Sequence, residues 1–124
     1  MSRKTTGCSK GRAKLTATPI IRRSLTDVIY VVSEHYGVSP SELLGNGCGK
    51  LVAEARSVAY ALSRDLTPAS LPEIGEVFSR DHSTVMTMVQ RVAERAMKNN
   101  SFAFSIAVCR ARAVTTIRAR RLVP

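Results

Sequence analysis

The sequence predicts an all-α domain made of several short helices. Through residues 25–98, apolar side chains recur every three or four positions, which is the spacing of one face of an α-helix. Two segments, 39–42 and 70–73, pair a Ser with a Glu three positions later, and Pro follows closely behind each Ser. This pattern is typical of a capped helix start. The 124 residues, 44% of them apolar, suffice for one modest core.

The first helix is expected over residues 25–36. Ser24 is placed to cap it, and Asp27 follows three residues later to complete a capping box. Gly37 supplies the left-handed conformation at which such a helix commonly ends. The buried face would comprise Leu25, Val28, Ile29, Val32 and Tyr36.

A short second helix starts at Pro40, and a third covers 50–66. The buried stripe of the third would be Leu51, Val52, Ala55, Ala59, Leu62 and Leu66. Arg56, Tyr60 and Arg64 recur every four residues on its other side, where we expect them to be exposed. The two arginines would lie about 12 Å apart along the axis. Side chains at this spacing could contact successive phosphates of a nucleic acid. The spacing is equally consistent with a solvent-exposed face on which the arginines form salt bridges.

The stretch 70–92, SLPEIGEVFSRDHSTVMTMVQRV, predicts two helices joined by a very short turn. Ser70 caps the first helix. The turn is residues 79–80, and Asp81 caps the second helix, which continues to about residue 98. The buried face of the first helix would be Leu71, Ile74, Val77 and Phe78. That of the second would be Val85, Met88, Val89, Val92 and Ala96.

The second of these helices opens with side chains that can exchange hydrogen bonds with base edges: Asp81, His82, Ser83 and Thr84. A carboxylate accepts from the cytosine amino group, an imidazole donates or accepts, and a Thr methyl packs on thymine. Two short helices, the second presenting its first residues, are the arrangement of a helix-turn-helix in the major groove of DNA. The remaining open side would comprise Met86, Thr87, Gln90 and Arg91.

The net charge of +10 is confined to the two ends of the chain. Residues 1–23 carry seven Lys or Arg and residues 99–124 carry five Arg, with no acid in either segment. Residues 24–98 carry seven basic and nine acidic residues. We therefore expect a flexible basic arm (1–23), a helix-turn-helix domain (24–98) and a basic C-terminal helix or tail (99–124). Such ends usually bind polyanions, and solubility alone is the alternative.

The C-terminal segment is expected to form a sixth helix capped by Ser101. It could dock on the domain through Phe102, Ile106, Cys109 and Val114. Its outside would carry Arg110, Arg112, Arg118, Arg120 and Arg121. A basic amphipathic helix can also lie on a membrane surface. Because Trp is absent and both bulky aromatics come early in the helix, we expect no membrane partner.

No pattern of catalytic, cofactor-binding or metal-binding residues stands out. The chain has two His, no HExxH, and three Cys without a CxxC pair (Cys8, Cys48 and Cys109). Neither a zinc site nor a disulfide framework is therefore predicted. The glycine-rich stretch 45–50, GNGCGK, fails as an ATP-binding loop because its glycine spacing is wrong, Leu51 follows Lys50, and a helix precedes it. We expect a non-enzymatic cytoplasmic protein without a cofactor, associated with the nucleoid.

The segments LPEIGEVF and SRDHSTV resemble the C-terminal DNA-binding domain of the bacterial replication initiator DnaA. That family carries a Leu-Pro-(Asp/Glu)-Ile-Gly helix followed by Arg-Asp-His-(Ser/Thr)-Thr-Val. The resemblance covers roughly residues 24–98, including the two Leu that end the second helix and the pattern Arg56, Ala59, Ala61 and Leu62 in the third. It implies an all-helical, Trp-repressor-like fold and a duplex DNA ligand carrying an initiator-type box.

The resemblance also implies which residues would touch DNA. The bases would be contacted by Asp81, His82, Ser83 and Thr84, and the backbone by Arg56, Arg64, Thr67, Leu71 and Pro72. To these, we add Thr87 for the bases and Lys50, Ser70, Arg80 and Arg91 for the backbone.

Three features differ from the family pattern. The ATPase domains that precede this module in the initiator are absent, so we do not expect the chain to melt an origin by itself. The turn is one residue shorter than the family's Phe-Gly-Gly-Arg-Asp-His. Before the third helix, where the family sends an arginine into the minor groove, GNGCGK keeps only Lys50 as a basic residue. The basic ends would replace the lost affinity in a sequence-independent and salt-sensitive way.

These observations predict a sequence-specific duplex-DNA-binding protein that acts as a regulator or competitor in replication or transcription. The sequence does not determine its oligomeric state, and a monomer is slightly favoured. The alternative is a module of the same fold that binds a host replication protein or binds nucleic acid nonspecifically.

Overall fold

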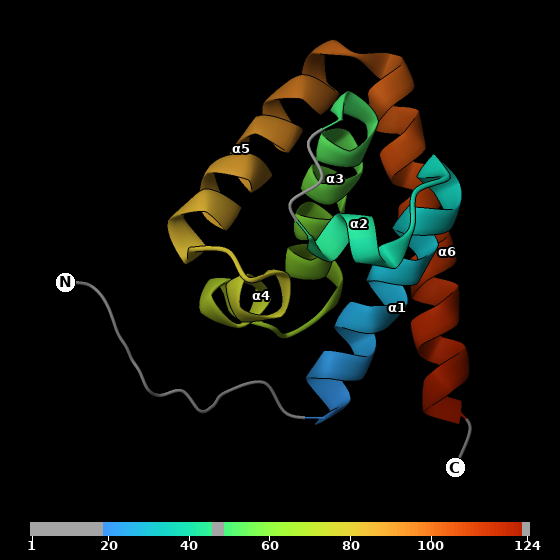
Figure 1. Cartoon of the computed structure of the whole chain (residues 1–124). Helices are drawn as coiled ribbons and strands as arrows, with labels where there is room; N and C mark the ends of the chain where they lie inside the picture. The colour runs from blue at the N-terminus through green and yellow to red at the C-terminus, as the bar shows by residue number, and fades with distance from the viewer. Residues whose placement is uncertain (1–18, 46–48, 123–124) are drawn as a thin grey trace, which may run out of the picture.

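The computed structural model describes residues 19–45 and 49–122, and these form six helices without a strand (Figure 1). The helices are α1 (Pro19–Tyr36), α2 (Pro40–Leu44), α3 (Lys50–Leu66), α4 (Leu71–Phe78), α5 (His82–Lys98) and α6 (Asn100–Leu122). The predicted all-α class is confirmed, and so are the bounds of α3. Cys8, Cys48 and residues 1–18 of the predicted basic arm lie outside the described residues.

The helices are packed around α3, which contacts each of the other five. In Figure 1, α5 and α6 form two long sides that meet at a tight corner, and α1 runs alongside α6. α4 lies across the lower end of α5, joined to it by a very short turn. This arrangement places α4 and α5 at one side of the domain, with α3 between α5 and α6 (Figure 1).

The core is aliphatic with few aromatic rings, as the composition predicts. It includes Leu25, Val28 and Val32 of α1, Leu43 of α2, Ala55, Val58 and Leu62 of α3, Ile74 and Phe78 of α4, Val85 of α5, and Cys109 and Ala113 of α6. The rings of Tyr60 and Phe78 meet edge to face, with 4.7 Å between their centroids. Because burying one large apolar side chain contributes about 1.5–3 kcal/mol, this core holds α4 and α5 firmly against the rest.

The predicted start of the first helix is wrong. α1 begins at Pro19, so residues 19–23 of the expected arm are helical. Ser24 and Asp27 are buried in its interior and do not cap it. The helix extends further because Ile21 packs against the core, and Pro19 fits a first helical turn. A local capping pattern was therefore outweighed by tertiary packing.

Two expectations for α3 are also wrong. Tyr60, expected to be exposed, is only 2% exposed because its ring packs against Phe78. Leu51, expected in the buried stripe, is 52% exposed in the first turn of the helix. Since other helices surround α3, its buried surface is wider than one stripe.

The C-terminal helix docks on the domain as expected, with a different cap. The Asn99 side-chain oxygen accepts a hydrogen bond from the Phe102 N–H (3.0 Å), so Asn99 and not Ser101 caps α6. The docked face consists of Phe102, Cys109, Ala113 and Ile117, with Ile106 half-buried beside them. Val114, also expected there, is half-buried.

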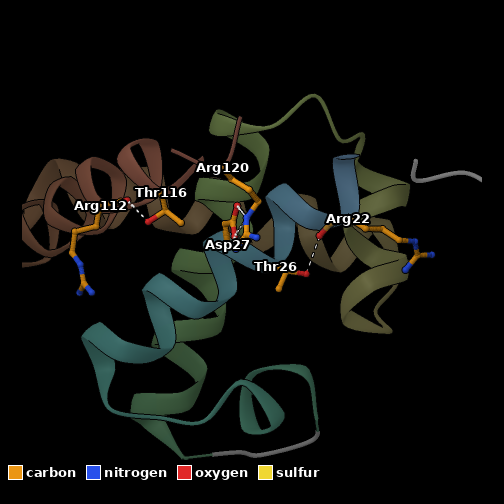
Figure 2. Close-up of polar contacts among 6 residues, drawn as sticks. All are labelled: Arg22, Thr26, Asp27, Arg112, Thr116 and Arg120. Carbon is orange, nitrogen blue, oxygen red and sulfur yellow. Dashed lines mark hydrogen bonds and ion pairs between the residues drawn. The ribbon is translucent and has the colours of Figure 1, made fainter. Parts of the chain in front are cut away.

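Three of the arginines expected to line the outside of α6 are bound to acids of other helices. Arg110 pairs with Asp65, and Arg112 pairs with Glu34 at 2.7 Å. Arg120 donates through Nε to both Asp27 carboxylate oxygens (2.9 Å) and through Nη2 to one of them (2.7 Å), as Figure 2 shows. These contacts stabilise the docking of α6 and leave less of its charge for a ligand.

We expect Arg120→Ala to lower Tm by about 5–10 °C. Asp27 is only 2% exposed, so the substitution leaves a buried carboxylate without its charged partner. Arg118→Ala is the matched control, because Arg118 is an exposed arginine of the same helix. Its Tm should stay within about 2 °C of the wild-type value in thermal unfolding followed by circular dichroism. Equal Tm values for the two variants would contradict this role of Asp27 and Arg120.

Among the described residues, no group of three or more His, Cys, Asp or Glu could hold a metal ion. None of the described helices is long and apolar enough to cross a membrane. Cys109 is fully buried, and burial raises the pKa of its thiol to about 11, so it remains a protonated core residue at neutral pH.

Candidate nucleic-acid interface

α4 begins with the capping box that the sequence predicts. The Ser70 hydroxyl accepts a hydrogen bond from the Glu73 N–H (3.3 Å), and the Glu73 carboxylate accepts one from the Ser70 N–H (2.7 Å). Pro72 lies in the first turn of α4. Proline is tolerated there because the N–H groups of the first turn make no intrahelical hydrogen bond. Ile74 and Phe78 are fully buried, so the inner face of α4 is held by the core.

The turn between α4 and α5 is closed by backbone hydrogen bonds. Ser79 adopts a left-handed conformation (φ 55°), and the Arg80 N–H then donates to the Gly75 carbonyl at 2.8 Å. A Cβ on residue 75 would lie 2.4 Å from the Arg80 carbonyl oxygen. Only glycine allows this approach, so the short turn depends on Gly75.

α5 begins at His82 with Asp81 as its N-cap, as predicted. The Asp81 Oδ2 atom accepts from the Ser83 N–H (3.3 Å) and from the Ser83 hydroxyl. Its other oxygen, Oδ1, lies 3.7 Å from Nδ1 of His82. One carboxylate oxygen thus caps the helix, and the other lies beside the exposed imidazole of His82.

The Ser83 hydroxyl, helped by backbone N–H groups and by His82, holds the pKa of the Asp81 carboxyl below its usual value. The folded pKa is therefore lower than the unfolded one. The cap stabilises α5 fully above the unfolded pKa of about 3.9, and this stabilisation is lost as the pH falls through the folded pKa.

All the candidate base contacts are exposed on the outer side of α5: Asp81, His82, Ser83, Thr84 and Thr87. The side chains of Asp81 and His82 are 67% and 60% exposed. On the inner side, Val85 and Val92 are buried, and Met88 and Val89 are half-buried against the core. The structure thus brings the five polar residues together at the free start of a helix whose other face is anchored.

This arrangement was compared with known protein families. The family model for the bacterial dnaA protein helix-turn-helix matches residues 25–92, more than half of the chain. The chain belongs to this family. The resemblance stated from the sequence is confirmed, and the chain carries a DnaA-type DNA-binding domain.

The chain is similar to curated replication initiators and to a solved structure. The chain is 38% identical over 104 residues to the chromosomal replication initiator protein DnaA of Deinococcus radiodurans, covering 84% of this chain and 22% of that one. It is 48% identical over 71 residues to the protein of the same name from Thermus thermophilus, covering 56% of this chain and 16% of that one. The crystal structure of a DNA replication initiation factor matches with a TM-score of 0.71 and 29% identity, covering 79% of this chain and 30% of that one. The chain thus spans about a fifth of the length of these curated relatives.

The candidate backbone contacts of the DnaA-type domain differ in exposure. The exposed ones are Lys50, Arg64, Ser70, Pro72 and Arg91, and Leu71 is half-buried. Thr67 is buried, and its hydroxyl donates to the Ser63 carbonyl (2.7 Å) and accepts from the Ala69 N–H (3.2 Å). Thr67 therefore completes the C-terminal end of α3, and its hydroxyl already has partners within the domain.

Arg56 and Arg80 also have partners within the domain. Arg56 donates through Nε to the Leu43 carbonyl (2.8 Å). Its Nη2 donates to the carbonyls of Glu42 (2.9 Å) and Gly45 (3.0 Å). Arg80 donates through Nη2 to the same Gly45 carbonyl at 2.7 Å. Both side chains are half-buried, and neither simply projects into solvent.

A groove lies between α3, α4 and α5, along the second and third turns of α5. It is lined by Arg64, Asp65, Leu71, Met86, Val89 and Gln90. Arg64 and Leu71 thus share a surface with the outer face of α5. Met86 and Gln90 were absent from the expected contact set, although they lie three and seven residues after Ser83 on the same helical face. Lys50 lines a separate hollow with Glu54 and Arg95.

Proposed function

We propose that this chain binds duplex DNA sequence-specifically and occupies initiator-type boxes. The observation that carries the proposal is the exposed start of α5, where Asp81, His82, Ser83 and Thr84 are all accessible. A helix-turn-helix places these positions against base edges in the major groove. The anchored inner face of α5 supports the proposal, because specific recognition requires side chains held in place.

In this proposal, Asp81, His82, Ser83, Thr84 and Thr87 contact the bases. The backbone is contacted by Lys50, Arg64, Ser70, Leu71, Pro72 and Arg91. His82 donates to or accepts from a base, Oδ1 of Asp81 accepts from a cytosine amino group, and the Thr methyl groups pack against thymine. Backbone contacts fix the register, and base contacts supply the specificity.

Charge outside the helix-turn-helix contributes to affinity. Residues 24–98 carry more acid than base, and three arginines of α6 are paired with acids of other helices. Residues 1–18 carry five Lys or Arg and no acid. We propose that this segment contacts phosphates without regard to sequence, which makes affinity strongly salt-dependent.

We propose a regulatory role in replication or transcription, in which the chain competes with a full-length initiator for the same boxes. This role needs binding alone, without ATP hydrolysis, and it places the protein on the nucleoid. Each monomer would occupy one box. We also propose a host replication protein as a partner in this role.

A gel-shift titration with an initiator-type box and a scrambled duplex of equal length tests the proposal. We expect tighter binding to the box at fixed salt and no change on adding ATP. Equal binding to both duplexes would indicate a nonspecific nucleic-acid binder. Binding to neither duplex would favour a protein-interaction module of the same fold.

A further inference from the structure

The carbonyls at the end of α2 receive their hydrogen bonds from other parts of the chain. α2 has only five residues and no basic residue in its last turn. The final carbonyls of a helix have no intrahelical donors, and a positive charge there is favourable. Arg56 and Arg80 supply the donors and the positive charge. The Nη2 atoms of both arginines donate to the Gly45 carbonyl oxygen, which has two lone pairs and can accept two hydrogen bonds. We call this arrangement of Arg56, Arg80 and the Gly45 carbonyl the Gly45 clasp.

Arg80 also holds the turn of the helix-turn-helix. Its Nη1 donates to the carbonyls of Phe78 (3.0 Å) and Ser79 (3.3 Å), at the end of α4. One guanidinium thus bridges the end of α4 and the end of α2, although Arg80 and Gly45 lie 35 residues apart in the sequence. The next residue, Asp81, is the N-cap of α5. The clasp therefore ties the residue directly before the N-cap of α5 to the end of α2.

We infer that Arg80 is a positioning residue that sets the specificity of the helix-turn-helix, and that it is not a phosphate contact. The inference rests on the proposed function for its effect on box recognition. The clasp itself is a property of the protein without DNA. Arg80 acts through Asp81 and His82, because its bonds hold the backbone from which these side chains project.

Arg80→Lys separates the two roles. Lysine is a single compact donor group that binds phosphate well, but it cannot span carbonyls on two elements as a guanidinium does. We expect Arg80→Lys and Arg80→Ala both to lower the ratio of box to scrambled affinity by about tenfold, with an unchanged slope of log K against log salt. Two results together would show a phosphate contact and overturn the inference. Arg80→Lys would keep the wild-type ratio of box to scrambled affinity, and Arg80→Ala would reduce the slope of log K against log salt by about one.

Arg91→Ala provides the comparison for a phosphate contact. Arg91 is an exposed arginine of α5 and belongs to the proposed backbone contacts. Its removal should weaken binding to both duplexes by a similar factor and reduce the salt slope by about one. If Arg80→Ala showed this same behaviour, Arg80 would be a phosphate contact.

Amide hydrogen exchange without DNA tests the clasp independently. The Gly45 N–H donates to the Ser41 carbonyl (2.9 Å), so its exchange reports opening at the end of α2. We expect faster exchange at Gly45, by about tenfold, in Arg80→Ala and Arg80→Lys, and wild-type exchange in Arg91→Ala. Unchanged exchange in both Arg80 variants would overturn the clasp even if the protein binds its box. Failure of the wild-type protein to bind a box would instead overturn the proposed function.

Discussion

Gly75→Ala is expected to disable the helix-turn-helix. The added Cβ would lie 2.4 Å from the Arg80 carbonyl oxygen, so the backbone of the turn must move. The same turn is closed by the hydrogen bond from the Arg80 N–H to the Gly75 carbonyl. Overpacking of this kind costs about 1–3 kcal/mol, and sometimes more. Urea denaturation should show the loss in the free energy of unfolding, and the affinity for the box should fall with it.

Gly49→Ala is the matched control for this substitution. A Cβ at residue 49 would meet nothing within 4 Å, so the same chemical change carries no clash there. Gly49→Ala should lower the free energy of unfolding by at most about 1 kcal/mol, because Ala is a poorer N-cap residue than Gly. Equal free energies of unfolding for Gly75→Ala and Gly49→Ala would contradict the close approach at the turn.

His82→Ala is expected to lower the discrimination between box and scrambled duplex by about 1–3 kcal/mol, or about 5- to 150-fold. The His82 side chain is exposed at the first position of α5, with no role in the core. Its removal should therefore leave the free energy of unfolding and the affinity for scrambled duplex nearly unchanged. Titrations of both duplexes at one salt concentration measure the ratio.

Met97→Ala serves as the control for His82→Ala. Met97 belongs to the same helix but lies in its last turn, and its side chain is 86% exposed. The ratio of the two affinities should match the wild-type value in this variant. If His82→Ala left the ratio of box to scrambled affinity unchanged, α5 would not be the recognition helix.

Local signals explain why much of the fold could be predicted. The capping boxes at Ser39 and Ser70 involve residues three positions apart, and the structure confirms both. The same kind of signal failed at Ser24 and Asp27, because the partner of Asp27 is Arg120, 93 residues further along the chain. A carboxylate that ends a capping pattern and one that binds a distant arginine look alike in sequence.

The candidate site was predictable where it follows helical periodicity. The spacing of the apolar residues in α5 identifies the face that packs on the core. His82, Ser83 and Thr87 lie outside that face, so their exposure could be predicted. The bonds of Arg56 and Arg80 were not predictable, because their acceptors are backbone carbonyls at the end of another helix. Tyr60 was missed for a similar reason, since its partner Phe78 lies on α4.

The central claim is that the exposed start of α5 reads the sequence of duplex DNA. Selection of bound duplexes from a random pool, at one fixed salt concentration, tests it most directly. We expect the wild-type chain to enrich a single motif of the initiator-box type, and His82→Ala to lose preference at some positions of that motif. Retention of duplexes without a shared motif, or the same motif from both proteins, would contradict the claim.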